Sequence, residues 1–260
     1  MSEKRVTIQG ASIRYLEEGS GEPILLLPSS AGRATEYQEL IPLLSRRLHV
    51  YAVDYPGFGR SDPLPGIEGT EDLAAFILGW LDAVGLRKTH LVGFSLGGWI
   101  SLLLALAHPE RIEALILIAT SAGRLPDVPI VSPSGMNFKE ILDRFYHRNE
   151  VREKLARQRR TLEEREEVLR SSQALARLVK QKKIIPELHH RLKEIRLPTL
   201  ILSADHDRAI PPVYQERLHS GILSSKRATF IETGHAIVAE RPDELAAEIL
   251  TFIEENPPVH

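Results

Sequence analysis

The sequence predicts a single α/β domain in which a mostly parallel sheet carries helices on both faces. Two observations predict this fold class. Apolar runs of strand length alternate with helical stretches along most of the chain, and this alternation stops between residues 124 and 197 before it resumes at Thr199. A chain of 260 residues, 43% of them hydrophobic, is long enough for one large core with an insertion.

The elements follow in order from the N-terminus. Two β-prone runs separated by Gly10, at residues 6–8 and 13–16, predict a hairpin at a sheet edge. Continuous apolar runs predict strands covered on both faces, as in a parallel sheet, at residues 24–27, 50–53, 90–92, 114–118 and 199–202. Helices are predicted between them at residues 36–46, 70–84 and 96–107, and Pro109 ends the last one.

Residues 124–197 are predicted to form an insertion, so that the core domain comprises residues 1–123 and 198–260. The insertion contains no convincing strand and becomes charged and helical. Val151, Leu155, Leu162 and Leu169 recur at spacings of four and seven, which predicts a helix with one apolar stripe. Its intermixed charges favour a solvated helix face over a nucleic-acid surface.

The composition excludes several function classes. The chain has 33 basic and 35 acidic residues, a net charge of -2, so no overall field would attract nucleic acid or an anionic membrane. The absence of cysteine excludes disulfides, thiolate catalysis and Cys-based zinc sites. No secretory signal pattern is visible, and the longest apolar run, residues 100–107, is too short to cross a bilayer. We expect a cytoplasmic protein that needs no metal or cofactor and has a small-molecule partner.

The segment Gly93-Phe94-Ser95-Leu96-Gly97 carries the strongest chemical signal. It lies where the apolar strand ending at Val92 must turn sharply into a helix, and glycines flank the serine. Such a turn exposes the serine hydroxyl at a helix N-terminus, where the Leu96 N–H and the helix dipole both favour negative charge. The alternative is a glycine-rich turn with an idle serine, which the flanking strand and helix disfavour.

Outside the insertion, almost the whole chain resembles the α/β-hydrolase superfamily, in its single-domain group with a helical cap. The elbow around Ser95, residues 54–62 (DYPGFGRSD) and residues 107–112 (AHPERI) match segments of that family. The resemblance implies an eight-stranded, mostly parallel sheet with a helical cap after the sixth strand. It also implies a catalytic triad in the order Ser, Asp or Glu, His.

That order selects the partners of Ser95. The family places the acid four residues before a proline, which favours Asp207 over Asp205 because Pro211 follows. His235 follows a strand, adjoins Gly234 and precedes a terminal helix, and so matches the base. A metal site at Asp205, His206 and Asp207 is disfavoured because neighbours on one short loop rarely converge on an ion.

The loop after the third strand is expected to complete the site. Here Pro28-Ser29-Ser30-Ala31-Gly32 replaces the usual His-Gly start, and it resembles a variant found in enol-lactone hydrolases. The matching position predicts that the backbone N–H groups of Ser30 and Leu96 form the oxyanion hole. Dehalogenase and epoxide hydrolase activities are disfavoured because both use an aspartate where Ser95 stands.

Three functions remain open from the sequence. The first is a carboxylic ester or lactone hydrolase that works through an acyl-enzyme on Ser95. The second is a C–C bond hydrolase or cofactor-free perhydrolase with the same triad. The third is a ligand receptor on a hydrolase scaffold with little or no turnover.

Overall fold

The computed structural model describes residues 1–180 and 187–257. Its sheet has eight strands in the order β1-β2-β4-β3-β5-β6-β7-β8. The strands are β1 (Ser2–Ile8), β2 (Ala11–Glu18), β3 (Pro23–Leu27), β4 (His49–Val53), β5 (Thr89–Phe94), β6 (Ile112–Ile118), β7 (Thr199–Ala204) and β8 (Ser225–Phe230). Only β2 pairs antiparallel with its neighbours, β1 and β4. The predicted eight-stranded, mostly parallel sheet is confirmed.

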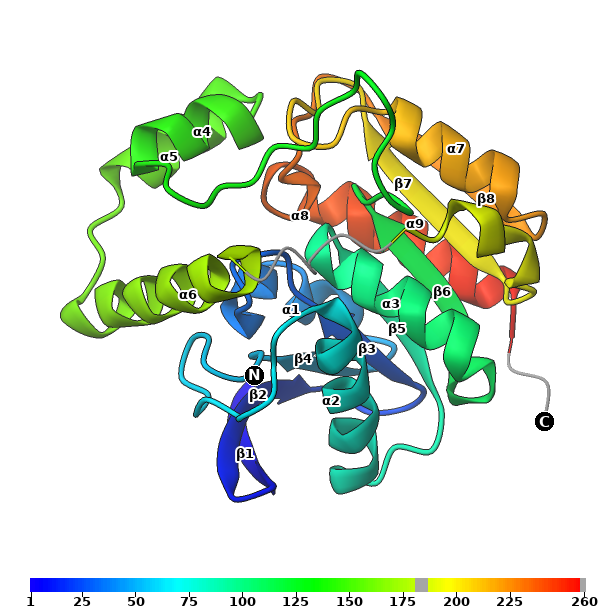
Figure 1. Ribbon diagram of the computed structural model, residues 1–260, viewed down its shortest axis with the longest axis horizontal. Coiled ribbons are helices and arrows are strands. Elements are labelled where there is room, and N and C mark those ends of the chain that lie inside the picture. The colour runs from blue at the N-terminus through cyan, green and yellow to red at the C-terminus, as the bar shows by residue number, and fades with distance from the viewer. Residues whose placement is uncertain (181–186, 258–260) are drawn as a thin grey trace.

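Helices cover both faces of the sheet (Figure 1). One face packs on α2 (Thr70–Ala83), α3 (Leu96–Ala107) and α7 (Val213–Gly221), and the other on α1 (Ile41–Leu44), α8 (Ile237–Glu240) and α9 (Pro242–Glu255). The strand side chains alternate between these layers: Leu25 and Leu27 of β3 belong to the first core, and Ile24 and Leu26 to the second. The inner strands β3 to β7 are buried at nearly every position and mostly apolar, because neither of their faces meets water. The edge strands β1 and β8 are largely polar and exposed.

The first predicted helix differs from the structure. Residues 36–46 do not form one helix: a 3-10 turn, η1 (Ala34–Tyr37), precedes the four-residue α1, with Pro42 in its first turn. Proline favours a new helix start because it has no N–H to donate to a preceding turn. The short 3-10 turn η2 (Pro109–Arg111) follows α3.

The segment between β6 and β7 contains α4 (Phe138–Phe145), α5 (Asn149–Arg157), α6 (Leu162–Lys180) and the 3-10 helix η3 (His189–Glu194). The three α-helices gather on one side of the molecule (Figure 1). The predicted apolar stripe is wrong, because Thr161 and Glu164 form a capping box that starts a new helix, and Leu162 and Leu169 are exposed. In the described residues, no helix is both long and apolar enough to cross a membrane.

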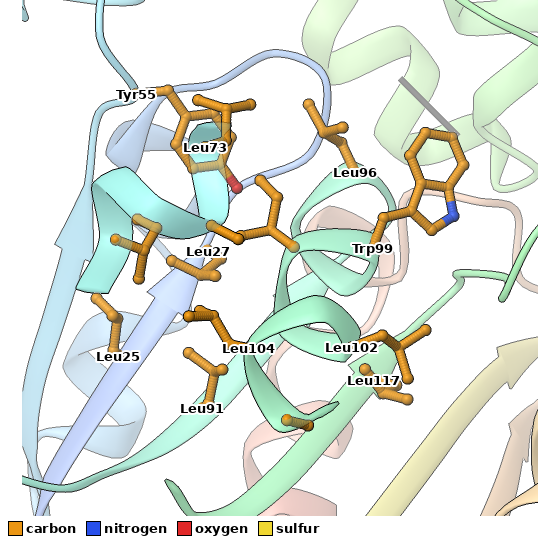
Figure 2. Packing of buried hydrophobic residues seen from close by; sticks show 14 of the residues in the cluster. Leu25, Leu27, Tyr55, Leu73, Leu91, Leu96, Trp99, Leu102, Leu104 and Leu117 are labelled. Atoms are coloured by element: carbon orange, nitrogen blue, oxygen red, sulfur yellow. The ribbon is translucent and has the colours of Figure 1, made fainter. Parts of the chain in front are cut away.

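Leucine packing fixes α3, the helix that begins directly after Ser95. Figure 2 shows leucines of β3 and β5 packed beneath α3, with Leu104 of the helix beside Leu91 of the sheet. Trp99, one turn into α3, is buried and its indole N–H donates a 2.9 Å hydrogen bond to Ser121 Oγ. The helix N-terminus is therefore held in place by the core on one side and by the segment that follows β6 on the other.

Candidate active site

Ser95 lies in the sharp turn between β5 and α3. Its backbone has φ 54° and ψ -110°, a conformation that residues with a side chain rarely adopt. The chain after β6 supports this turn: the Ser95 N–H donates to the Ile118 carbonyl at 2.9 Å, and the Thr120 hydroxyl donates to the Ser95 carbonyl at 2.8 Å. The predicted strand-turn-helix context of Ser95 is confirmed.

Gly93 and Gly97 allow the close contacts that this turn requires. A Cβ on Gly93 would lie 2.4 Å from the Gly97 carbonyl oxygen and 2.4 Å from Ser101 Oγ. A Cβ on Gly97 would lie 2.2 Å from the Leu27 carbonyl oxygen and 2.8 Å from that of Pro28. The start of α3 can thus approach the loop after β3 only because Gly97 has no side chain.

Buried polar groups hold that loop in place. The hydroxyl of Tyr37 donates to the Leu27 carbonyl at 2.7 Å, and that of Tyr55 donates to the Pro28 carbonyl at 2.8 Å. The Glu36 carboxylate accepts hydrogen bonds from the Ser29 N–H at 2.8 Å and from its hydroxyl at 2.5 Å. Burial raises the pKa of Glu36 above its usual value, against the lowering effect of these bonds.

The loop and the helix start present two backbone donors. In the part of the chain that the structure describes, the N–H groups of Ser30 and Leu96 have no hydrogen-bond partner within the protein. Ser30 follows the serine that Glu36 fixes, and Leu96 is the first residue of α3. An unpaired N–H at each position is what an oxyanion hole requires. The assignment of Ser30 and Leu96 to that role remains a prediction.

Asp207 and His235 meet in a buried pair. Asp207 Oδ2 lies 2.7 Å from His235 Nδ1, and both side chains are almost fully buried. The other carboxylate oxygen, Oδ1, accepts hydrogen bonds from the N–H groups of Ala209 and Ile210, each at 2.8 Å. These two donors orient the carboxylate, and the carboxylate in turn favours a proton on Nδ1 that leaves Nε2 free to accept another.

Asp205, the alternative acid, has different partners. Its carboxylate accepts hydrogen bonds from the backbone N–H groups of Glu232 and Thr233, each at 3.1 Å, and it pairs with His206 Nδ1 at 2.8 Å. Burial acts in the opposite direction, but these hydrogen bonds together lower the pKa of Asp205. Asp205 thus shapes the loop that carries His235, while Asp207 contacts the imidazole. Among the described residues, no group of three or more His, Asp or Glu side chains is arranged to hold a metal ion.

The His235 ring lies between two aromatic side chains. Phe94, the residue before Ser95, has its ring centroid 5.2 Å from that of His235. Phe145, at the end of α4, approaches the imidazole edge-on at 5.4 Å, and its carbonyl accepts a 3.0 Å hydrogen bond from the Ala236 N–H. The structure therefore places His235 against the elbow on one side and against the insertion on the other.

Sequence reasoning missed the groups that support the site. Glu36, Tyr37 and Tyr55 hold the oxyanion loop, and Phe145 contacts the base, yet none belongs to a motif with a catalytic residue. A weak signal existed for the two tyrosines, because a buried hydroxyl needs a partner. Nothing in the sequence indicated which carbonyl each hydroxyl would reach.

Comparisons with known proteins agree with this fold. A hydrolase from Pseudomonas putida, 2-hydroxy-6-oxononadienedioate/2-hydroxy-6-oxononatrienedioate hydrolase 2, is 30% identical over 95% of this chain and 89% of its own length. A crystal structure of a meta-cleavage product hydrolase variant aligns with a TM-score of 0.84 at 25% identity, covering 97% of this chain and 98% of the other. A bacterial membrane phospholipase A aligns at 0.83 with 27% identity, covering 98% and 86%.

The sequence profile described as the Alpha/beta hydrolase family matches residues 24–248, a span that includes the elbow, the Asp207 loop and the His235 loop. Because this match covers most of the chain, the protein belongs to the alpha/beta hydrolase family.

Proposed function

We propose that this protein is a serine hydrolase that cleaves a carboxylic ester or lactone through an acyl-enzyme on Ser95. The observation that carries the proposal is the buried 2.7 Å pair of Asp207 and His235, placed against the strained turn that holds Ser95. This combination gives a nucleophile, a base and a group that orients the base. The N–H groups of Ser30 and Leu96, which have no partner among residues 1–180 and 187–257, supply donors for the developing negative charge.

The proposed reaction has two halves. His235 Nε2 takes the Ser95 proton as Oγ attacks the carbonyl carbon, and the tetrahedral oxyanion faces the Ser30 and Leu96 N–H groups. Collapse breaks the bond to the alcohol oxygen, which receives the proton from His235. Water then gives a proton to His235 and attacks the acyl carbon. Collapse of this second intermediate breaks the bond to Oγ, which takes the proton back from His235, and the acid leaves. Asp207 stabilises the imidazolium in both halves.

A second candidate is a C–C bond hydrolase for an oxo acid. The name of the relative from Pseudomonas putida describes hydroxy-oxo acids, and two cations of this chain suit a carboxylate. Arg33, three residues after Ser30, has a buried Nε without a partner in the described residues. Burial, and then the positive charge of Arg33, lower the pKa of Arg160. Two neighbouring cations that repel one another favour an anion between them.

We propose that residues 124–197 form a cap over Ser95 and that the substrate is a small molecule held beneath it. Phe145 of α4 contacts the His235 loop. Two further contacts join α6 to the loop after β4: Ser171 Oγ accepts a 3.1 Å hydrogen bond from the Gly59 N–H, and Glu167 pairs with Arg60. A docked insertion of this kind shields the site from bulk water.

Fluorophosphonate labelling and a substrate panel test the function. Wild type should be labelled and should turn over p-nitrophenyl esters, lactones or hydroxy-oxo acids, and Ser95→Ala should lose both properties. Ser172→Ala, which removes an exposed hydroxyl on α6, is the matched control and should behave as wild type. Turnover that survives in Ser95→Ala would refute the proposal. Binding of a panel compound with no turnover in wild type would favour the receptor.

A further inference from the structure

Glu240 is a buried carboxylate that the proposed reaction does not use. It is the last residue of α8, only 3% exposed, and lies between the His235 loop and α9. Burying a carboxylate is costly unless its oxygens are hydrogen-bonded. Both oxygens of Glu240 are bonded to backbone groups, and these groups belong to two segments far apart in sequence.

One oxygen contacts the residue beside the base. Glu240 Oε2 accepts a 2.5 Å hydrogen bond from the N–H of Gly234, which directly precedes His235. The other oxygen contacts the insertion: Oε1 accepts hydrogen bonds from the N–H groups of His147 and Arg148, at 2.6 and 2.7 Å. Arg148 also reaches back, since its Nη1 donates to the Glu240 carbonyl at 3.2 Å.

The two segments that Glu240 joins are in close contact. A Cβ on Gly234 would lie 2.7 Å from the His147 nitrogen and 2.8 Å from the Phe145 carbonyl oxygen. His147 stacks on His206 of the acid loop, with ring centroids 3.8 Å apart. Residues 145–148 therefore touch the loops of both Asp207 and His235, and the Glu240 carboxyl group joins residues 147–148 to the His235 loop.

We infer that Glu240 is a positioning residue, whose carboxylate sets His235 by fastening the backbone of Gly234 to residues 145–148 of the insertion. The inference rests on the proposed function, because it assigns Glu240 to the alignment of the proposed base. The docking of residues 145–148 and the alignment of His235 then share these three hydrogen bonds. A small displacement of a catalytic group, of about 1 Å, lowers turnover by about a hundredfold.

Glu240→Gln is the sharpest perturbation. The amide keeps one acceptor oxygen and turns an N–H2 group toward the donors on the other side, so the bonds to Gly234 or those to His147 and Arg148 are lost. Glu240→Asp keeps two acceptor oxygens on a shorter side chain and should restore part of the loss. Glu248→Gln, an exposed position on α9, is the matched control.

Two measurements follow. We expect kcat per fluorophosphonate-labelled site to fall about a hundredfold in Glu240→Gln, with a smaller change in KM, because a displaced base weakens the transition state. By NMR, the amide hydrogens of Gly234, His147 or Arg148 should exchange at least about tenfold faster than in wild type. A merely structural role of Glu240 would lower activity by unfolding part of the enzyme. Dividing kcat by the number of labelled sites removes that effect.

The outcomes separate this inference from the proposed function. If Ser95→Ala keeps its activity, the proposed function fails, and the amide exchange still reports on the contacts of Glu240. If Ser95 is essential but folded Glu240→Gln keeps wild-type kcat per site, the positioning role is wrong. If neither Glu240→Gln nor Glu240→Asp folds while Glu248→Gln does, Glu240 serves the stability of the fold and the inference is also overturned.

Discussion

Asp207→Asn is expected to abolish catalysis while leaving the fold intact, for a reason that the hydrogen bonds of Asp207 define. Oδ1 accepts from two backbone N–H groups, those of Ala209 and Ile210, whereas Oδ2 has one partner among the described residues, His235 Nδ1. The asparagine oxygen will take the side with two donors, because the opposite orientation forfeits two hydrogen bonds at about 1–3 kcal/mol each. The amide N–H2 then points at His235.

An N–H2 group at that position reverses the role of Nδ1. It donates to Nδ1, so the ring proton moves to Nε2, and the imidazole can no longer take a proton from Ser95. The expected loss in kcat is about 10⁴-fold, which corresponds to about 5.5 kcal/mol of transition-state stabilisation. The melting temperature should change little, because the two bonds to Ala209 and Ile210 are kept.

The assay is steady-state turnover of whichever panel ester, lactone or oxo acid wild type cleaves, with thermal melts run on the same samples. Asp205→Asn is the comparison, since Asp205 binds the backbone of Glu232 and Thr233 and not the imidazole. We expect it to lose at most about tenfold, from a looser His235 loop. A folded Asp207→Asn variant within tenfold of wild type, or a larger loss in Asp205→Asn, would refute the reasoning.

Three further predictions concern the loop after β3. Gly97→Ala should lose about 1–3 kcal/mol of unfolding free energy in urea and nearly all activity, because the new Cβ meets the Leu27 carbonyl oxygen. The control is Gly79→Ala, where the new Cβ meets open space, and its unfolding free energy should rise by about 0.4–1 kcal/mol. Wild-type activity in Gly97→Ala would contradict this. Tyr55→Phe leaves the Pro28 carbonyl unpaired and should cost about 1–3 kcal/mol together with a lower kcat; an unchanged kcat would show that this bond does not hold the loop. Burial raises the pKa of Glu36, so the folded protein keeps the Glu36 proton to a higher pH than the unfolded chain does. The contribution of Glu36 to stability therefore falls as the pH rises from about 4.3, the unfolded pKa, through the raised pKa of the folded state. Glu36→Gln cannot titrate and lacks this decline. Urea denaturation at several pH values should therefore show the unfolding free energy of Glu36→Gln increasing relative to wild type over this pH range. A constant difference would count against a raised pKa of Glu36.

Local patterns in the sequence determined the fold class and the position of the elbow. Apolar runs with helices between them indicated a sheet covered on both faces. The structure confirms it, because each of the inner strands β3 to β7 divides its side chains between two cores. The strand-to-helix turn at Ser95 was predictable because its requirements, small neighbours and an adjacent helix start, lie within a few residues. Chain order and the resemblance placed Asp207 and His235 on loops that do meet.

Tertiary structure alone decided what supports those residues. Glu240 bonds to His147, 93 residues away in sequence, and Tyr55 bonds to Pro28, 27 residues away; no local pattern encodes such partners. The helical stripe on Leu162 and Leu169 was wrong for a related reason, since the side of a helix that becomes buried depends on what it packs against. α6 buries Glu167 and Ser171 because Arg60 and Gly59 offer them partners. Short-range sterics thus determined where Ser95 sits, and long-range hydrogen bonds decided how its surroundings are held.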